Sequence, residues 1–172
     1  MKNLSDKPCS ISSVKAAVTA ILRPFGFVLK SNSYLREAGK LVHILNLQKS
    51  NYSPYYYFNL GIYSKDVNAG PPPKDPAMAH LYARATMLLP EAELALFTSA
   101  SDEDVQMGQH DREARLRHTI CNFLIPAFEA FENTEDLLNL ARHYKPSDTG
   151  WMALRPLLIA AGRKLPLETK TM

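Results

Sequence analysis

The chain has 172 residues, of which 46% are hydrophobic and 22% are charged. This length and balance fit one globular domain with a buried core and exclude a chain that is disordered throughout. The net charge of +3 is too small to indicate a nucleic-acid-binding protein by itself. No apolar stretch reaches the length of about 18 residues that a membrane-spanning helix needs, so we expect no contact with a membrane.

The cysteines and the N-terminal residues predict a cytoplasmic protein. Cys9 and Cys121 are far apart and stand beside no further cysteine, so they form no zinc-binding framework. Residues 1–10 carry Lys2, Asp6 and Lys7 and lack the apolar segment of a signal peptide. We therefore expect reduced thiols in a reducing compartment.

The first element in chain order is a helix. Ser10 and Ser12 are both candidate N-caps, and apolar residues recur at helical spacing from Val14 onward. Pro24 disfavours helical geometry in the residue before it, so the helix should end near Arg23.

Four extended segments follow, separated by polar turns, at residues 27–30, 34–37, 41–48 and 55–63. The last alternates most clearly, which predicts a strand with one buried face. Its expected core face comprises Tyr56, Phe58, Leu60 and Ile62. Its expected outer face comprises Tyr55, Tyr57, Asn59, Gly61 and Tyr63.

A loop is predicted over residues 64–76, where Pro71, Pro72 and Pro73 favour a stiff extended segment. Residues 80–89 alternate again and are predicted to form a strand that ends at Pro90. A short helix is expected over residues 91–97, and an exposed linker over residues 99–108.

The C-terminal part is predicted to be helical. Residues 111–131 carry one apolar stripe, and Pro126 should kink that helix because it removes a backbone hydrogen bond. Thr134 is expected to cap the next helix, and a last helix should pack through Trp151.

This order of elements predicts an α+β fold: an antiparallel β-meander of about four to five strands, packed on one face by an N-terminal helix and C-terminal helices. We expect one domain over residues 1–172. Residues 133–172 would be a helical extension of a core over residues 10–132.

Three stretches of the sequence resemble a known family: Gly26-Phe27, residues 45–50 (Leu-Asn-Leu-Gln-Lys-Ser) and residues 57–62 (Tyr-Phe-Asn-Leu-Gly-Ile). The pattern is similar to the bacterial domain-of-unknown-function 4304 family, and the resemblance covers roughly residues 12–131. It implies an α+β fold and supplies neither an activity nor catalytic residues.

A polar face of the predicted sheet is the first candidate for function. If neighbouring strands pair in simple meander order, one face collects amides, phenols and a guanidinium, from Asn46, Gln48, Tyr55, Tyr57, Asn59, Tyr82 and Arg84. These groups combine flat contact area with hydrogen bonding, which suits recognition of a peptide or another polar ligand. The alternative is that they are only the solvated face of an antiparallel sheet.

The main hypothesis is a non-enzymatic binding module with a protein partner, as in immunity-type proteins that neutralise a toxin. A nucleic-acid-associated module is the alternative, because Arg112, Arg115, Arg117 and His118 could meet phosphates while the tyrosines stack on bases. A solvated helix face is the better explanation of that basic run, because Asp111 and Glu113 dilute it.

An enzyme with an unrecognised site comes third. The sequence has no His-Glu-x-x-His, Gly-x-Ser-x-Gly or phosphate-binding glycine motif, so we predict no catalytic residues, no metal and no cofactor. The acidic run Asp102-Glu103-Asp104 could ligate a cation but is expected to be an exposed linker. His43 is expected to be half-buried, and His80 could join Tyr82 and Arg84 in a polar pocket.

Overall fold

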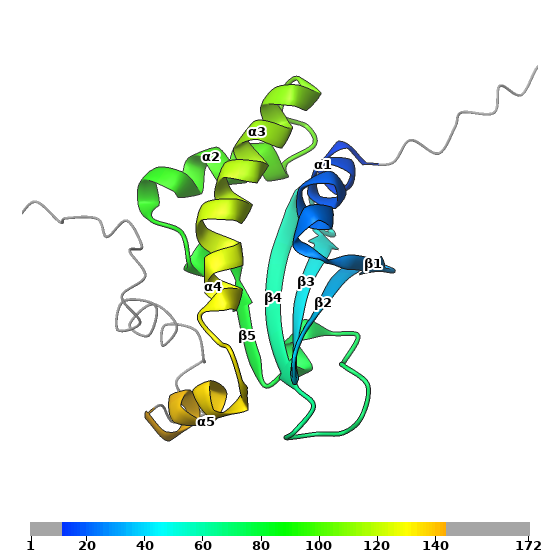
Figure 1. Cartoon of the computed structure of the whole chain (residues 1–172). Helices are drawn as coiled ribbons and strands as arrows, with labels where there is room; N and C mark the ends of the chain where they lie inside the picture. The colour runs from blue at the N-terminus through cyan, green and yellow to red at the C-terminus, as the bar shows by residue number, and fades with distance from the viewer. Residues whose placement is uncertain (1–11, 144–172) are drawn as a thin grey trace, which may run out of the picture.

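A computed structural model describes residues 12–143 of the chain and confirms the α+β fold (Figure 1). Its centre is a five-stranded antiparallel sheet in the order β1-β2-β3-β4-β5, which is the predicted meander. The strands are β1 (Val28–Lys30), β2 (Ser33–Ala38), β3 (Leu41–Lys49), β4 (Tyr56–Ser64) and β5 (Leu81–Arg84). The α-helices are α1 (Ser13–Leu22), α2 (Glu91–Ser101), α3 (Gln109–Thr119), α4 (Ile125–Glu129) and α5 (Thr134–His143). Short 3₁₀ turns are η1 (Arg23–Phe25), η2 (Pro76–Met78) and η3 (Ala85–Met87), and η4 (Ile120–Leu124) is a π-helix.

Helix α1 begins and ends where local chemistry dictates. Ser12 is the N-cap, and its hydroxyl oxygen accepts a hydrogen bond from the Lys15 backbone N–H at 3.3 Å. The Ser12 hydroxyl also donates to the Glu103 carboxylate, which ties the start of the helix to the segment after α2. Pro24 converts the last turn into η1, and Gly26 reverses the chain at a φ of 80°.

The hydrophobic core fills the space between the helices and one face of the sheet. The face is formed by Leu45 of β3, Leu60 of β4 and Ala83 of β5, which are register neighbours, and all three are buried. Phe58 meets Phe97 of α2 edge to face at a centroid distance of 4.9 Å. The predicted core face of β4, comprising Tyr56, Phe58, Leu60 and Ile62, is confirmed, since each residue is at most 4% exposed. Burial of each such side chain contributes roughly 1.5–3 kcal/mol, which makes this face the main support of the fold.

Within residues 12–143, an apolar cluster covers the opposite face of the sheet at one end. There Val42, Ile44 and Tyr63 form a small apolar cluster, with Ala79 packed against it. The chain after η2 approaches the sheet closely at Gly61, where an added Cβ would lie 3.1 Å from the Ala79 Cβ and 3.2 Å from the Pro76 oxygen. The absence of a side chain at Gly61 therefore lets segment 76–79 lie directly on β4.

The element boundaries predicted for residues 80–108 are wrong. β5 stops at Arg84, and η3 follows, with the Leu88 N–H donating to the Ala85 carbonyl at 2.9 Å. Ala and Met favour helical turns, so the apparent alternation in residues 85–89 was accidental. Helix α2 runs on to Ser101, beyond the predicted end at residue 97. The supposed linker thus begins as helix, and Asp102 and Glu103 are only partly exposed.

The long helix predicted over residues 111–131 is interrupted as expected, by a π turn. The Ile125 N–H donates to the Ile120 carbonyl, five residues back, immediately before Pro126. Proline has no N–H, so the helix must change its hydrogen-bond pattern at this point.

Helix α5 is capped by Asn133, which corrects the prediction for Thr134. The Asn133 side-chain oxygen accepts from the backbone N–H groups of Glu135 (2.8 Å) and Asp136 (3.2 Å). The Thr134 hydroxyl instead bonds Ser64 at 2.8 Å and donates to Asp66 at 2.9 Å, which joins α5 to the end of β4. The predicted last helix and Trp151 lie outside the described residues.

Candidate functional site

The strand register places most of the predicted site residues on one surface, away from the core helices. Asn46 and Gln48 of β3 lie opposite Asn59 and Tyr57 of β4, and Arg84 of β5 lies opposite Asn59. Tyr82, opposite Gly61, shares this face. We call the set Asn46, Gln48, Tyr55, Tyr57, Asn59, Tyr82 and Arg84 the polar face.

Tyr55 sits at the rim of the polar face. It precedes β4 and forms an isolated bridge with Asp102, after α2. Its ring meets the Tyr57 ring edge to face at a centroid distance of 5.0 Å. Burial raises the pKa of the Tyr55 phenol, so it stays neutral at physiological pH.

Asn59 is the centre of a hydrogen-bond network on the polar face. It is 2% exposed, and its amide nitrogen donates to the Gln48 oxygen at 3.0 Å and, more weakly, to the Asn46 oxygen at 3.5 Å. Its own side-chain oxygen accepts from the Tyr82 hydroxyl at 3.1 Å. Every hydrogen-bonding group of this buried amide is thereby used, and the network holds its neighbours in fixed orientations.

The network extends to the hairpin between β1 and β2. The Asn46 amide nitrogen donates to the Ser33 hydroxyl at 3.0 Å and to the Asn32 carbonyl at 3.3 Å. Both side-chain amide hydrogens of Asn46 are therefore engaged. Asn46, Gln48, Asn59 and Tyr82 are held in place by these bonds and form the floor of the site.

A cavity of about 450 Å³ opens above this floor. One wall is the sheet and the other is the chain around η2, and the lining residues are Asn46, Gln48, Asn59, Lys74, Asp75, Pro76, Ala77 and Tyr82. The Asp75 carboxylate caps η2 by accepting from the Ala77 N–H at 2.9 Å. The sequence did not predict that residues 74–77 line the site, although Asp75-Pro76 is a typical start for a helical turn.

Arg84 stacks beside this cavity. Its guanidinium carbon lies 4.7 Å from the centroid of the Tyr57 ring, a cation–π contact. In the described part of the chain, the ion pairs include neither Arg84 nor Lys74. Lys74 and Arg84 thus carry two positive charges at the cavity, and among the described residues Asp75 is the one carboxylate that lines it.

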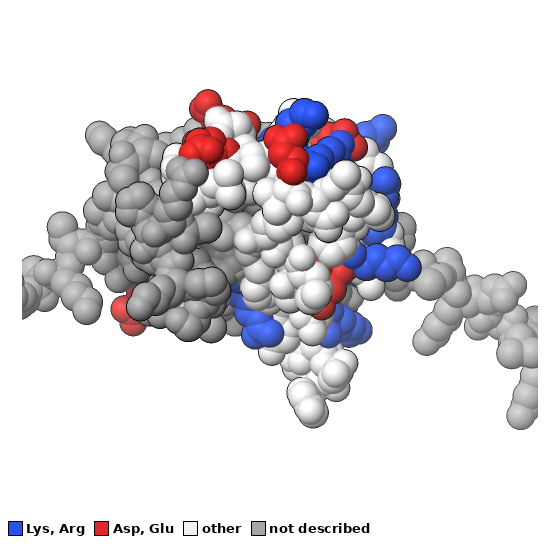
Figure 2. Space-filling model, turned by 90° about the horizontal axis from the view of Figure 1, so that it is seen from below, with Lys and Arg blue, Asp and Glu red and all other residues white. Residues whose placement is uncertain are grey.

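The basic run on α3 does not form an open cationic surface. Arg112 is 3% exposed, and its guanidinium donates to the carbonyls of Ala100, Asp102 and Val105 at 2.7–2.9 Å. Arg117 pairs with Glu113 at 2.6 Å. Figure 2 views the molecule from below, away from α3, and on that other side Lys and Arg are interspersed with Asp and Glu.

The histidines lie apart from the polar cavity. His80 does not join Tyr82 and Arg84: its ring stacks on Tyr63 at 4.8 Å, and its Nδ1 accepts from the Ser64 N–H at 2.8 Å. Burial lowers the pKa of His80, which favours this neutral, accepting form. His43 is 1% exposed, so it is fully buried where partial burial was expected. Within residues 12–143, no cluster of three or more His, Cys, Asp or Glu side chains could hold a metal.

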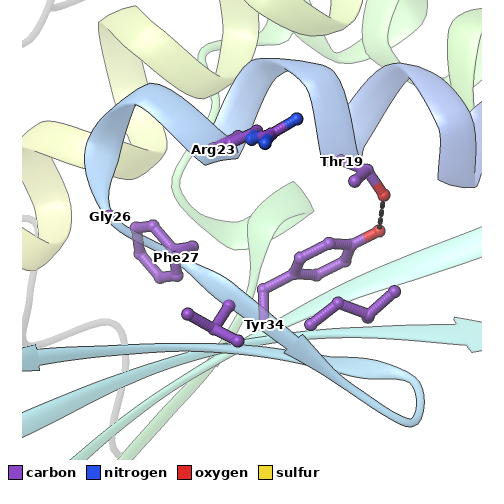
Figure 3. A pocket seen from close by; sticks show the side chains of 7 residues that line it. Thr19, Arg23, Gly26, Phe27 and Tyr34 are labelled. Carbon is purple, nitrogen blue, oxygen red and sulfur yellow. Dashed lines mark hydrogen bonds between the residues drawn. The ribbon is translucent and has the colours of Figure 1, made fainter.

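A second cavity, of about 400 Å³, lies between α1 and the β1–β2 hairpin. Figure 3 shows the Tyr34 hydroxyl meeting Thr19 at one end, at 2.8 Å, with Phe27 at the other and Arg23 above. Val28 and Leu29 also line it and are 60% and 47% exposed. This apolar cavity was not predicted and contains no residue of the polar face.

Comparisons with known proteins give one match. A family model described as a domain of unknown function (DUF4304) matches residues 18–125, more than half of the 172-residue chain. The matched stretch spans all five strands and therefore the whole polar face. Neither the curated proteins nor the solved structures yield a match. None of the described helices is both long and apolar enough to cross a bilayer.

Proposed function

The chain belongs to the DUF4304 family, whose description names no activity, and we propose that it is a non-enzymatic binding module that recognises a protein partner through the polar face. The observation that carries this proposal is the cavity beside segment 74–77, whose floor is the hydrogen-bonded set of Asn46, Gln48, Asn59 and Tyr82. A floor of this kind needs no reorganisation when a ligand binds, which reduces the entropic cost of association.

The residues around the cavity support a protein partner. Tyr57 and Arg84 are held together by their cation–π contact, and Tyr55 packs against Tyr57. Tyrosine and arginine are the residue types, with tryptophan, that most often dominate binding energy at protein interfaces. Their mutual packing fixes both side chains, so little side-chain entropy is lost on binding.

An intracellular setting is part of the proposal. Cys121 is a free, half-buried thiol, and burial raises its pKa, which keeps it protonated and unreactive. A protein of this kind suits a reducing compartment.

Arg112 is buried and Arg117 is paired with Glu113, so neither of these two residues favours the nucleic-acid alternative.

The test is capture of partners from a lysate of the source cells by the immobilised full chain, with identification by mass spectrometry. Tyr57→Ala combined with Arg84→Ala should abolish capture of the specific partner while leaving the unfolding midpoint nearly unchanged. The matched control is Tyr52→Ala with Arg117→Ala, which removes the same residue types from exposed positions outside the polar face. Equal capture by both double variants would count against the proposal.

A further inference from the structure

The polar face differs from the rest of the sheet in its charge pairing. At the other end of the sheet, Lys65 pairs with Glu37 at 2.9 Å and Lys40 with Asp66 at 3.8 Å. Lys74 and Arg84, beside the cavity, take part in none of the ion pairs described for residues 12–143. Asp75 also lines the cavity, and its carboxylate, which caps η2, offsets one of these two cations, so the cavity and its edge retain one net positive charge.

Gln48 and Lys74 still have hydrogen-bond donors to offer to a ligand in the cavity. The amide hydrogens of Asn46 and Asn59 are used within the network. The Gln48 oxygen accepts from Asn59, and this bond directs the Gln48 NH₂ group away from the network; the side chain is exposed. The Gln48 amide and the Lys74 ammonium can both donate hydrogen bonds to a ligand. A negatively charged acceptor forms stronger hydrogen bonds with them than a neutral acceptor does.

We propose, building on the proposed function, that the partner presents an acidic side chain whose carboxylate enters this cavity between Gln48 and Lys74. The Gln48 amide donates to one carboxylate oxygen and the Lys74 ammonium neutralises the charge. The residues flanking that side chain lie along Tyr57 and Arg84. The ligand class is therefore an acidic peptide segment.

The same geometry disfavours a nucleic acid. One face of Tyr57 is covered by Arg84 at 4.7 Å, and its ring also contacts Tyr55 at 5.0 Å, so it offers a poor platform for base stacking. A nucleic-acid strand presents a regular series of phosphates that proteins neutralise with many cations, and this cavity has two beside it. Asp75 offsets one of these two cations, and one ligand carboxylate would match the charge that remains.

A nuclear magnetic resonance titration of the ¹⁵N-labelled full chain tests the proposal. The probe is the acetylated and amidated tripeptide Gly-Glu-Gly, and the neutral match is Gly-Gln-Gly with the same ends. The Glu peptide should shift the Gln48 side-chain NH₂ signals and the backbone signals of Asp75 and Ala77, with at least about 5-fold tighter binding than the Gln peptide. Lys74→Gln should remove most of that difference, whereas Lys65→Gln, at the paired end of the sheet, should not.

Other outcomes separate this proposal from the proposed function. Equal binding of the Glu and Gln peptides, or no shift with either, overturns the acidic ligand. The role of the polar face in partner binding is then tested separately, by whether the variant with Tyr57→Ala and Arg84→Ala still captures the partner. A short oligouridylate that shifts the Gln48 signals when the Glu peptide does not would also overturn the proposal, because the ligand would then be a nucleic acid.

Discussion

His43 is a buried histidine of which one ring nitrogen is hydrogen-bonded. Its Nδ1 accepts from the Arg36 guanidinium at 3.0 and 3.2 Å, so the proton of the neutral ring is on Nε2, which has no hydrogen-bond partner among residues 12–143. The ring stacks on Phe128 at 5.0 Å. Burial, reinforced by the charge of Arg36, lowers the pKa of His43 to about 3.

Folding should therefore weaken as the pH falls below the ordinary histidine pKa of about 6.5. The unfolded chain takes up a proton there and the folded chain does not, which costs up to about 1.4 kcal/mol per pH unit until the folded pKa of about 3. His43→Leu removes this dependence. Urea unfolding at pH 7.0 and 5.5 should show wild type losing about 1 kcal/mol more than the variant; parallel losses would contradict the assignment.

Arg112 is a buried cation that backbone carbonyl groups stabilise. Its guanidinium donates to Ala100, Asp102 and Val105, which lie at and just after the end of α2, where the helix dipole is negative. This arrangement satisfies the last carbonyls of the helix and fixes the turn that leads to α3.

Arg112→Met keeps most of the apolar stem and removes the donors. It should lower the free energy of unfolding by about 3 kcal/mol, because several partly buried carbonyls lose their charged partner. Arg115→Met, one turn of α3 away and exposed, is the control and should change stability by less than about 0.5 kcal/mol. Chemical denaturation of both variants measures the difference, and similar losses would show that Arg112 has no special role.

At the scale of elements, the contact between β4 and segment 76–79 determines the shape of the polar cavity. Pro76 and Ala77 form part of its wall, and Pro76 lies against Gly61. A methyl group at Gly61 would force this segment outward by a few tenths of an ångström, because a Cβ there lies 3.1 Å from that of Ala79.

Gly61→Ala should therefore destabilise the protein by about 1 kcal/mol or more and shift the backbone amide signals of segment 74–77. Ala79→Gly removes one of the contacted atoms. In a double-mutant cycle, Ala79→Gly should cost less in the Gly61→Ala background than in wild type. Additive free energies would mean that the two positions do not compete for space.

The alternation in β4 was sufficient to predict which residues face the core, but Asn59 and Tyr63 on the expected outer face are buried as well, at 2% and 3% exposed. The polar turns predicted the meander order, whereas the pairing register could only be assumed from the sequence; the observed pairs Asn46–Asn59 and Gln48–Tyr57 put these residues on the expected face. The end of β5 was not predictable, since Ala85 and Met87 suit either a strand or a turn. Segment 74–77 forms the second wall of the cavity because residues 76–79 pack against Gly61, which is distant in sequence. Arg112 is buried because it binds carbonyl groups at and after the end of α2. Both contacts are long-range, so no local sequence pattern predicts them.

For the whole molecule, the net charge is only +3, and ion pairs engage Arg36, Lys40, Lys65 and Arg117 among the described residues. Affinity for a polyanion grows with the number of phosphates that free cations neutralise. We expect weak binding to a single-stranded oligonucleotide, with a log–log salt slope on the order of −1 to −2 in fluorescence anisotropy. A slope near −5 would revive a nucleic-acid role.

The π turn at η4 has a consequence for how the chain tolerates changes in length. A five-residue hydrogen-bond step contains one residue more than a regular helix requires, and each residue advances an α-helix by about 100°. Removing the exposed Asn122 would let the turn revert to regular helix, in which the Ile125 N–H still bonds the Ile120 carbonyl, so the residues after it would keep nearly the same rotation about the helix axis. Phe128 would then stay on the ring of His43, because the π turn absorbs one residue without the rotation of about 100° that an extra residue causes in a regular helix.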